Sequence, residues 1–194
     1  TMNWGAIFAP IVAGAFADRF FQAQKVMGVL HLVGAALLWW ISSITDPGAF
    51  FWALLSYAIC YMPTLGLANA ISFHQMRDPA VEFPGVRVMG TLGWIAVGVA
   101  VGTAGPHIFG HSIEPTNLPL KLGAALSVLM GVYAFFLPAT PPANAGTRPS
   151  LAQALGLETL AFMKDRSFAI FTIGSALVCI PLSFYYSFAN VFLN

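Results

Sequence analysis

The chain has 194 residues and is too apolar for a protein that faces water on all sides: 58% of its residues are hydrophobic and 8% are charged, whereas soluble domains average roughly 25% charged residues. Its net charge of +1 gives no indication of nucleic-acid binding. A soluble all-helical protein with a large core is the alternative, but the apolar segments are as long as a bilayer is thick.

Six apolar segments, separated by turn-rich breaks, follow one another along the chain: residues 2–17, 26–44, 49–72, 86–103, 122–137 and 167–193. Several reach about 20 residues, which lets a helix cross a hydrocarbon core of roughly 30 Å at about 1.5 Å per residue. The period-2 alternation of membrane barrel strands is absent from the sequence. We therefore predict an all-α, polytopic helical membrane protein.

The charges of the connections predict the orientation, because cytoplasmic loops retain Lys and Arg. The second connection contains only Asp46, and the fourth contains Glu114 with Lys121 at its far edge. The first, third and fifth connections hold the other basic residues: Arg19, Lys25, Arg77, Arg87, Arg148, Lys164 and Arg166. We expect the odd connections inside the cell and the N-terminus of the chain outside. Many bacterial polytopic proteins begin inside, so we also expect one further helix upstream.

The fifth connection, FLPATPPANAGTRPS, is rich in Pro, Ala and Gly and is predicted to be a linker. In the segment SLAQALGLETLAFMKDR that follows, Ser150 and Gln153 have capping-box spacing. Leu151, Leu155 and Phe162 share one apolar side. We expect a short amphipathic helix on the cytoplasmic membrane surface, with a disordered connection as the alternative.

The first connection, GAFADRFFQAQK, combines small and charged residues at the end of a span. Gly14 is small enough for close helix contact, Asp18 and Arg19 mark the end of the span, and Lys25 opens the next one. This pattern is an interfacial charge cluster at a tight turn. It also resembles the loop signature of the major facilitator superfamily.

One face of the fourth span combines polar and aromatic groups. Arg87, Thr91 and Trp94 follow at i, i+4 and i+7 and therefore lie on one side of a helix, and Gly98 and Gly102 form a G-x-x-x-G helix-contact motif. A charge inside a membrane segment costs at least about 3 kcal/mol and usually faces a bundle interior or a wet cavity. This face is the candidate solute-binding site. The alternative is that Arg87 snorkels to the membrane interface.

Prolines interrupt three of the spans. Pro10, Pro63 and Pro181 each remove a backbone hydrogen bond and are expected to bend their helices, as the helices around transporter sites often are. His31 lies inside the second span, where we expect a core histidine, with membership of a proton relay as the alternative.

No chemistry of an enzyme is indicated. His107 and His111 have helical spacing, but Gly105, Pro106 and Gly110 argue against a helix there, so we expect no metal site. Catalytic and nucleotide-binding motifs are absent, and no acidic residue lies deep within a span. We expect neither enzyme activity nor a cofactor.

Five stretches in order, GAIFAPIVAGAFADRFF, SSITDPGAFFW, YMPTLGLANAISF, FPGVRVMGTLGWI and LGLETLAFMKDRSFAIF, resemble the nucleoside:proton symporter family of the major facilitator superfamily. The resemblance implies twelve transmembrane helices in two halves, of which this chain is similar to helices two to seven. Residues 1–137 would be most of the N-terminal half, residues 138–166 a cytoplasmic linker, and residues 167–194 the first helix of the C-terminal half.

The resemblance also implies a site and a function. In the family, an arginine, a threonine and an aromatic residue of the fifth helix line the nucleoside pocket, and the resemblance places them at Arg87, Thr91 and Trp94. Family members also carry two amide side chains on the seventh helix, where this chain has Ser183 and Tyr186. A serine and a phenol pair less well with a base edge, so another hydroxylated solute is an alternative substrate. We expect proton-coupled nucleoside uptake by alternating access in the bacterial cytoplasmic membrane. The expected partners are solute, protons, the lipid bilayer and the missing helices, without nucleic acid. A non-transporting sensor or scaffold is the other hypothesis.

Overall fold

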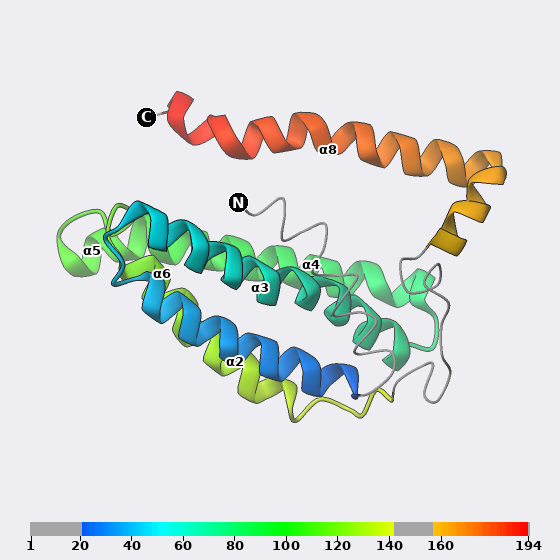
Figure 1. The fold of residues 1–194 in the computed structure, drawn as a ribbon, viewed down its shortest axis with the longest axis horizontal. Coiled ribbons are helices and arrows are strands. Elements are labelled where there is room, and N and C mark those ends of the chain that lie inside the picture. The colour runs from blue at the N-terminus through cyan, green and yellow to red at the C-terminus, as the bar shows by residue number, and fades with distance from the viewer. Residues whose placement is uncertain (1–20, 142–156, 194) are drawn as a thin grey trace. The chain divides into compact units, whose positions relative to one another are not determined.

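The computed structural model describes residues 21–141 and 157–193, and every regular element in these two ranges is a helix (Figure 1). The chain divides into two units, Thr1–Thr147 and Arg148–Asn194. The first contains α2 (Ala23–Ile41), α3 (Pro47–Gln75), α4 (Pro79–Val99), the π-helical segment η1 (Ala100–Ala104), α5 (Gly105–Phe109) and α6 (Leu118–Ala134). The second contains the 3-10 helix η2 (Leu157–Lys164) and α8 (Arg166–Leu193).

Four helices in the described part of the chain are long and apolar enough to cross a membrane: Ala23–Ile41, Pro47–Gln75, Pro79–Phe109 and Arg166–Tyr185. Helix α6 has 17 residues, or about 26 Å, which is at the short end of the range for a spanning helix. The all-α prediction is therefore confirmed, and five of the six predicted segments are helical. The remaining segment, residues 2–17 with Pro10, lies outside the described residues.

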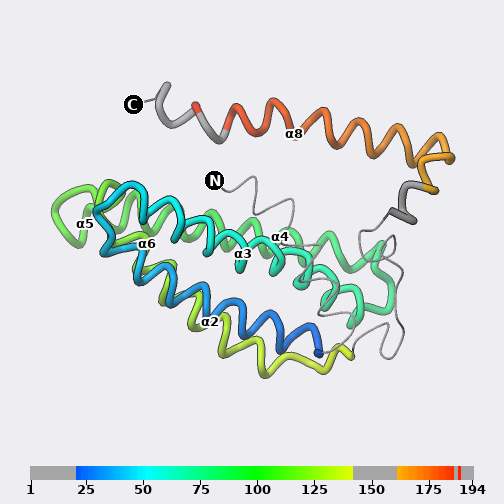
Figure 2. Tube along the Cα trace, in the orientation of Figure 1, coloured from blue at the N-terminus to red at the C-terminus, as the bar shows by residue number. Residues whose placement is uncertain are grey.

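Helix α2 packs against both α3 and α6, and its contact with α6 is a close backbone approach (Figure 2). A Cβ atom added to Gly28 would lie 2.9 Å from the ring of Phe135 and 3.0 Å from the carbonyl oxygen of Gly131. A Cβ atom added to Gly131 would lie 2.9 Å from Leu32. Small residues thus let the two backbones meet, as is common where helices associate in lipid.

A polar network joins three elements at one end of this bundle. The Thr140 N–H donates to Oε1 of Gln24 at 3.0 Å, and the Ala23 N–H donates to the Thr140 carbonyl at 3.2 Å. The Gln75 side chain, at the end of α3, donates to the Thr140 hydroxyl at 3.4 Å. Gln24 is 3% exposed and Thr140 is 7% exposed. Their mutual hydrogen bonds therefore offset the desolvation of buried polar groups.

Several hydroxyl groups in the helices or directly after them are satisfied locally. They donate to backbone carbonyls three or four residues earlier, which leaves few polar groups to face lipid. The hydroxyls that do so are those of Ser42, Ser43, Ser56, Thr64, Ser72, Thr91 and Thr103.

The fourth span is longer than the predicted residues 86–103, because the helix begins at Pro79 and runs to Phe109. The expectation that Pro106 would prevent a helix around His107 is wrong. Through η1 the chain forms a π-helical turn, in which the Gly105 N–H donates to the Ala100 carbonyl. Proline lacks an N–H, and a change of helical register just before it accommodates that loss. The helix ends at Gly110, whose φ of 74° is left-handed.

The connection between the units differs in part from the expected amphipathic α-helix. Ser150, Gln153, Leu151 and Leu155 lie outside the described residues. The part that is described, Leu157–Lys164, is a 3-10 helix. Phe162 packs against Phe168 of α8, with ring centroids 5.9 Å apart.

Candidate functional site

The candidate site lies on α4, whose first turn is built by local hydrogen bonds. The Asp78 carboxylate accepts from the Ala80 N–H at 3.1 Å, and the Glu82 carboxylate accepts from the Asp78 N–H at 3.0 Å. Pro79 occupies the start of the helix, where its missing N–H costs nothing. Two carboxylates near the positive N-terminal end favour the helix electrostatically. This cap fixes where the helix begins.

The three predicted residues of α4 do share one face. Arg87, Thr91 and Trp94 lie in one continuous helix and are all exposed, Trp94 at 72%. The Thr91 hydroxyl donates to the Arg87 carbonyl at 3.2 Å, which leaves its oxygen lone pairs available to a ligand. One helix face thus presents a guanidinium group, a hydroxyl group and an indole ring.

Within the first unit, no described element covers this face. Helix α4 has no buried residue, and Cβ atoms added to Gly90, Gly93 or Gly98 would meet no atom within 4 Å. Its packing against α3 includes a ring contact between Phe73 and Phe83, with centroids 4.4 Å apart. Within the described ranges, no acidic side chain forms an ion pair with Arg87.

Glycines at the end of the fourth span do not make the helix contact predicted for them within the described residues. Gly98 has open space around its Cα, and the nearest atom to a Cβ added to Gly102 would be Oε1 of Glu114 at 3.7 Å.

The remaining predicted site residues lie elsewhere in the chain. Ser183 is exposed on α8, in the second unit, two residues after Pro181. Tyr186 belongs to the same helix, but the structure does not describe its side chain. Of the loop motif, Gly14, Asp18 and Arg19 lie outside the described residues, whereas Lys25 is exposed in the first turn of α2.

The sequence analysis singled out His31 but missed the aromatic residues around it. Tyr61 of α3 meets the His31 ring edge-on, with centroids 6.5 Å apart, and Tyr57 stacks on Tyr61 at 5.5 Å. The i, i+4 spacing of the two tyrosines indicates that they share a face of α3. Only the packing of α2 against α3 brings the histidine to them. Among the described residues, no group of three or more possible metal ligands occurs.

The long apolar helices define the class: a multi-pass helical membrane protein. The sequence model of the family described as "Nucleoside H+ symporter" matches residues 1–194. The chain belongs to this family. The resemblance inferred from the sequence motifs is therefore confirmed.

Relatives with assigned names are transporters rather than enzymes. The chain is 47% identical over 190 residues to the putative nucleoside transporter YegT of Escherichia coli K12, covering 97% of this chain and 44% of that protein. It is 34% identical over 198 residues to the nucleoside permease NupG of the same organism, covering 100% of this chain and 46% of NupG. The xanthosine permease of E. coli K12 is 33% identical over 193 residues, covering 97% of this chain and 44% of the permease.

Solved structures agree with this fold. A crystal structure of a mutant of the nucleoside transporter NupG matches with a TM-score of 0.80 and 33% identity, covering 99% of this chain and 47% of that one. A second NupG crystal structure matches with a TM-score of 0.75 at the same identity and coverage. The chain thus spans less than half the length of the relatives it matches.

Proposed function

We propose that this chain is part of a proton-coupled nucleoside transporter that works by alternating access. Residues 1–137 would form most of its N-terminal half, residues 138–166 the cytoplasmic linker, and residues 167–194 the first helix of its C-terminal half. The protein would lie in the bacterial cytoplasmic membrane, with the N-terminus of this chain on the outer side. The names of the relatives and the loop charges support this proposal.

The observation that carries the proposal is the exposed polar face of α4 within an apolar span. A nucleoside presents a flat base and a polyhydroxyl ribose. The indole of Trp94 would stack on the base, and the guanidinium group of Arg87 would donate to carbonyl or hydroxyl oxygens. The hydroxyl of Thr91 would accept or donate a further hydrogen bond. Ser183 and Tyr186 would contribute from the seventh helix of the transporter.

Uptake of labelled uridine and adenosine into vesicles that contain the full-length protein tests the function. We expect uptake that requires an inward proton gradient and stops when a protonophore dissipates it. A panel of other hydroxylated solutes in the same assay tests the alternative substrate class, since Ser183 and Tyr186 replace amides. Correctly inserted protein that moves none of these compounds would instead support a sensor or scaffold.

Arg87 provides the residue-specific test. We expect Arg87→Ala to lower uptake at least about tenfold at unchanged membrane expression, because a charge-assisted hydrogen bond is worth roughly 1.5–3 kcal/mol. Arg87→Lys keeps the positive charge but loses the planar guanidinium with its paired N–H donors, so we expect it to restore little of the uptake. Arg77→Ala, at an exposed arginine between α3 and α4, is the matched control and should transport normally. Normal transport by both Arg87 variants would mean that Arg87 only snorkels to the interface.

A further inference from the structure

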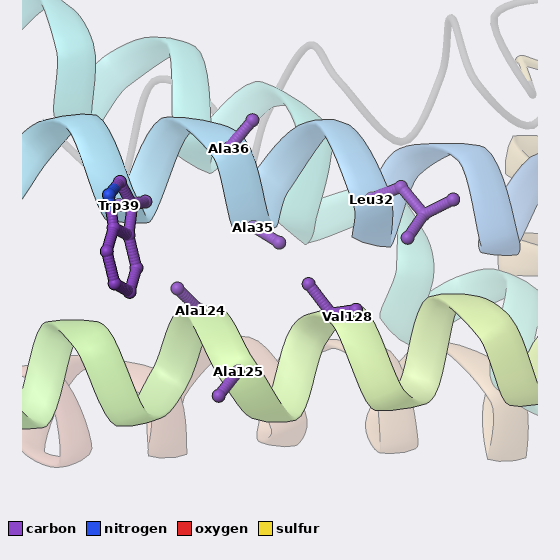
Figure 3. Close-up of a pocket in the computed structure, with 7 residues that line it drawn as sticks. All are labelled: Leu32, Ala35, Ala36, Trp39, Ala124, Ala125 and Val128. Carbon is purple, nitrogen blue, oxygen red and sulfur yellow. The ribbon is translucent and has the colours of Figure 1, made fainter.

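An apolar groove follows the contact between α2 and α6, on residues that the proposed transport mechanism does not use (Figure 3). It has a volume of about 320 Å³, close to the lower limit of roughly 300 Å³ for ligand pockets. Its described walls come from two helices, with Leu32, Ala35, Ala36 and Trp39 on α2 and Ala124, Ala125 and Val128 on α6.

The groove exists because its walls alternate small and large side chains. Ala35 and Ala124 are buried where the helices touch, whereas Ala36, Ala125 and Val128 are exposed along the opening. Leu32 and Trp39, at i and i+7 on α2, lie on the same side of the helix, with Ala35 and Ala36 between them. The opening is therefore elongated along the helices, and apart from the indole N–H of Trp39 its lining side chains are apolar.

A single cation marks one end of the groove. Nζ of Lys121, one turn before Ala124 on α6, lies 5.8 Å from the centroid of the Trp39 ring, a distance at which cation–π attraction operates. Within the described residues, Lys121 forms no ion pair. Asp46, in the connection at this end, is engaged elsewhere, because it caps α3 by accepting from the Ala49 N–H at 2.7 Å.

We propose that this groove binds one acyl chain of an anionic phospholipid of the surrounding bilayer, with the lipid phosphate at Lys121. A multi-pass protein exposes such a surface to hydrocarbon, so an apolar, elongated opening fits an acyl chain. A lysine and a tryptophan together at a helix end are typical of the headgroup level of a membrane. The uncompensated positive charge complements a negative headgroup there. The occupant is therefore a lipid of the leaflet that meets this end of α2 and α6.

Photolabelling in nanodiscs tests the proposal on the full-length protein. The discs contain phosphatidylethanolamine and a phosphatidylglycerol probe with a diazirine on its acyl chain, and mass spectrometry of peptides locates the adducts after irradiation. We expect adducts on the segments 32–39 and 124–128. Adducts distributed evenly over all lipid-facing helices, or none on these two segments because a second copy or another part of the protein covers them, would overturn the proposal.

Variants that fill the groove provide the matched comparison. Ala125→Phe and Ala36→Phe change exposed positions on opposite walls, so the fold should tolerate both, and each should remove the groove adducts. Leu129→Phe changes a residue of α6 that is 67% exposed and does not line the groove, and labelling should be unchanged. Equal labelling in all three variants would contradict binding in the groove.

The headgroup contact has its own readout. We expect Lys121→Gln to lower groove labelling by the phosphatidylglycerol probe about fivefold, since one interfacial lysine is worth about 1 kcal/mol toward anionic lipid. Labelling by a phosphatidylcholine probe with the same acyl chain should not change. Arg77→Gln, which removes a cation from the connection between α3 and α4, should leave both probes unaffected. An equal loss for both probes would exclude recognition of the anionic headgroup.

Discussion

Gln24 shows how much depends on a single polar side chain in an apolar bundle. Its Nε2 donates to Gln22 at 3.0 Å, and its Oε1 accepts from the Thr140 N–H, so both ends of the amide are used. Sequence analysis did not identify it, because a glutamine in the first turn of a helix resembles any interfacial polar residue. Its role arises from Thr140, 116 positions later in the chain. Arg87, in contrast, could be proposed as a candidate site residue from its own helix alone.

We expect Gln24→Leu to lower the free energy of unfolding by about 1–3 kcal/mol, because the Thr140 N–H would stay buried without an acceptor. Thermal unfolding of the purified protein, followed by tryptophan fluorescence, measures the change. The comparison variant is Gln75→Leu, which removes a longer bond of 3.4 Å made by an exposed residue and should change stability by less than about 0.5 kcal/mol. Equal effects of the two variants would show that burial of the acceptor does not matter.

At the scale of elements, the helices of the first unit differ in how far they are buried. Helix α2 has two described neighbours and buries residues along its whole length, whereas α4 buries none. Both are comparably apolar and were predicted as spans on the same grounds. Composition does not distinguish a buried helix such as α2 from an exposed one such as α4. In a membrane an apolar surface can face either another helix or lipid.

The glycine contact between α2 and α6 is the element-scale test. Gly28→Ala would place a methyl group 2.9 Å from Phe135 and 3.0 Å from a backbone oxygen, so we expect overpacking to lower the stability by about 1–3 kcal/mol. Gly66→Ala in α3 meets nothing within 4 Å and should raise the stability by roughly 0.5–1 kcal/mol through helix propensity. Thermal unfolding of both variants gives the comparison. A neutral Gly28→Ala would mean that the two helices separate easily.

At the scale of the whole molecule, the orientation in the membrane rests on loop charge. The proposed arrangement places Arg77 inside the cell and Glu114 outside, at opposite ends of the Pro79–Phe109 helix. Both residues are exposed, so an accessible label at each position reports the side of the membrane directly.

Cysteine labelling in intact cells measures this orientation. Cys60 and Cys179 are free thiols and would first be replaced by alanine. An impermeant maleimide should then label Glu114→Cys without treatment and Arg77→Cys only after the membrane is permeabilised. The reverse pattern would invert the proposed topology and place the Lys121 end of the groove in the inner leaflet.

The amino-acid sequence was sufficient to predict membrane helices and the residues of α4 that share a face. Hydrophobicity and helical period are local properties, so Arg87, Thr91 and Trp94 could be grouped without knowing any neighbour. The helix through Pro106 could not be predicted, because it depends on a π-helical turn at Ala100–Ala104. Tertiary structure alone decided the contact of Gly28 with Gly131, the hydrogen bond of Gln24 to Thr140, and the groove beside Trp39. Each of these joins residues that are distant in the sequence, and which distant surfaces meet is decided by side-chain packing, which no local pattern encodes.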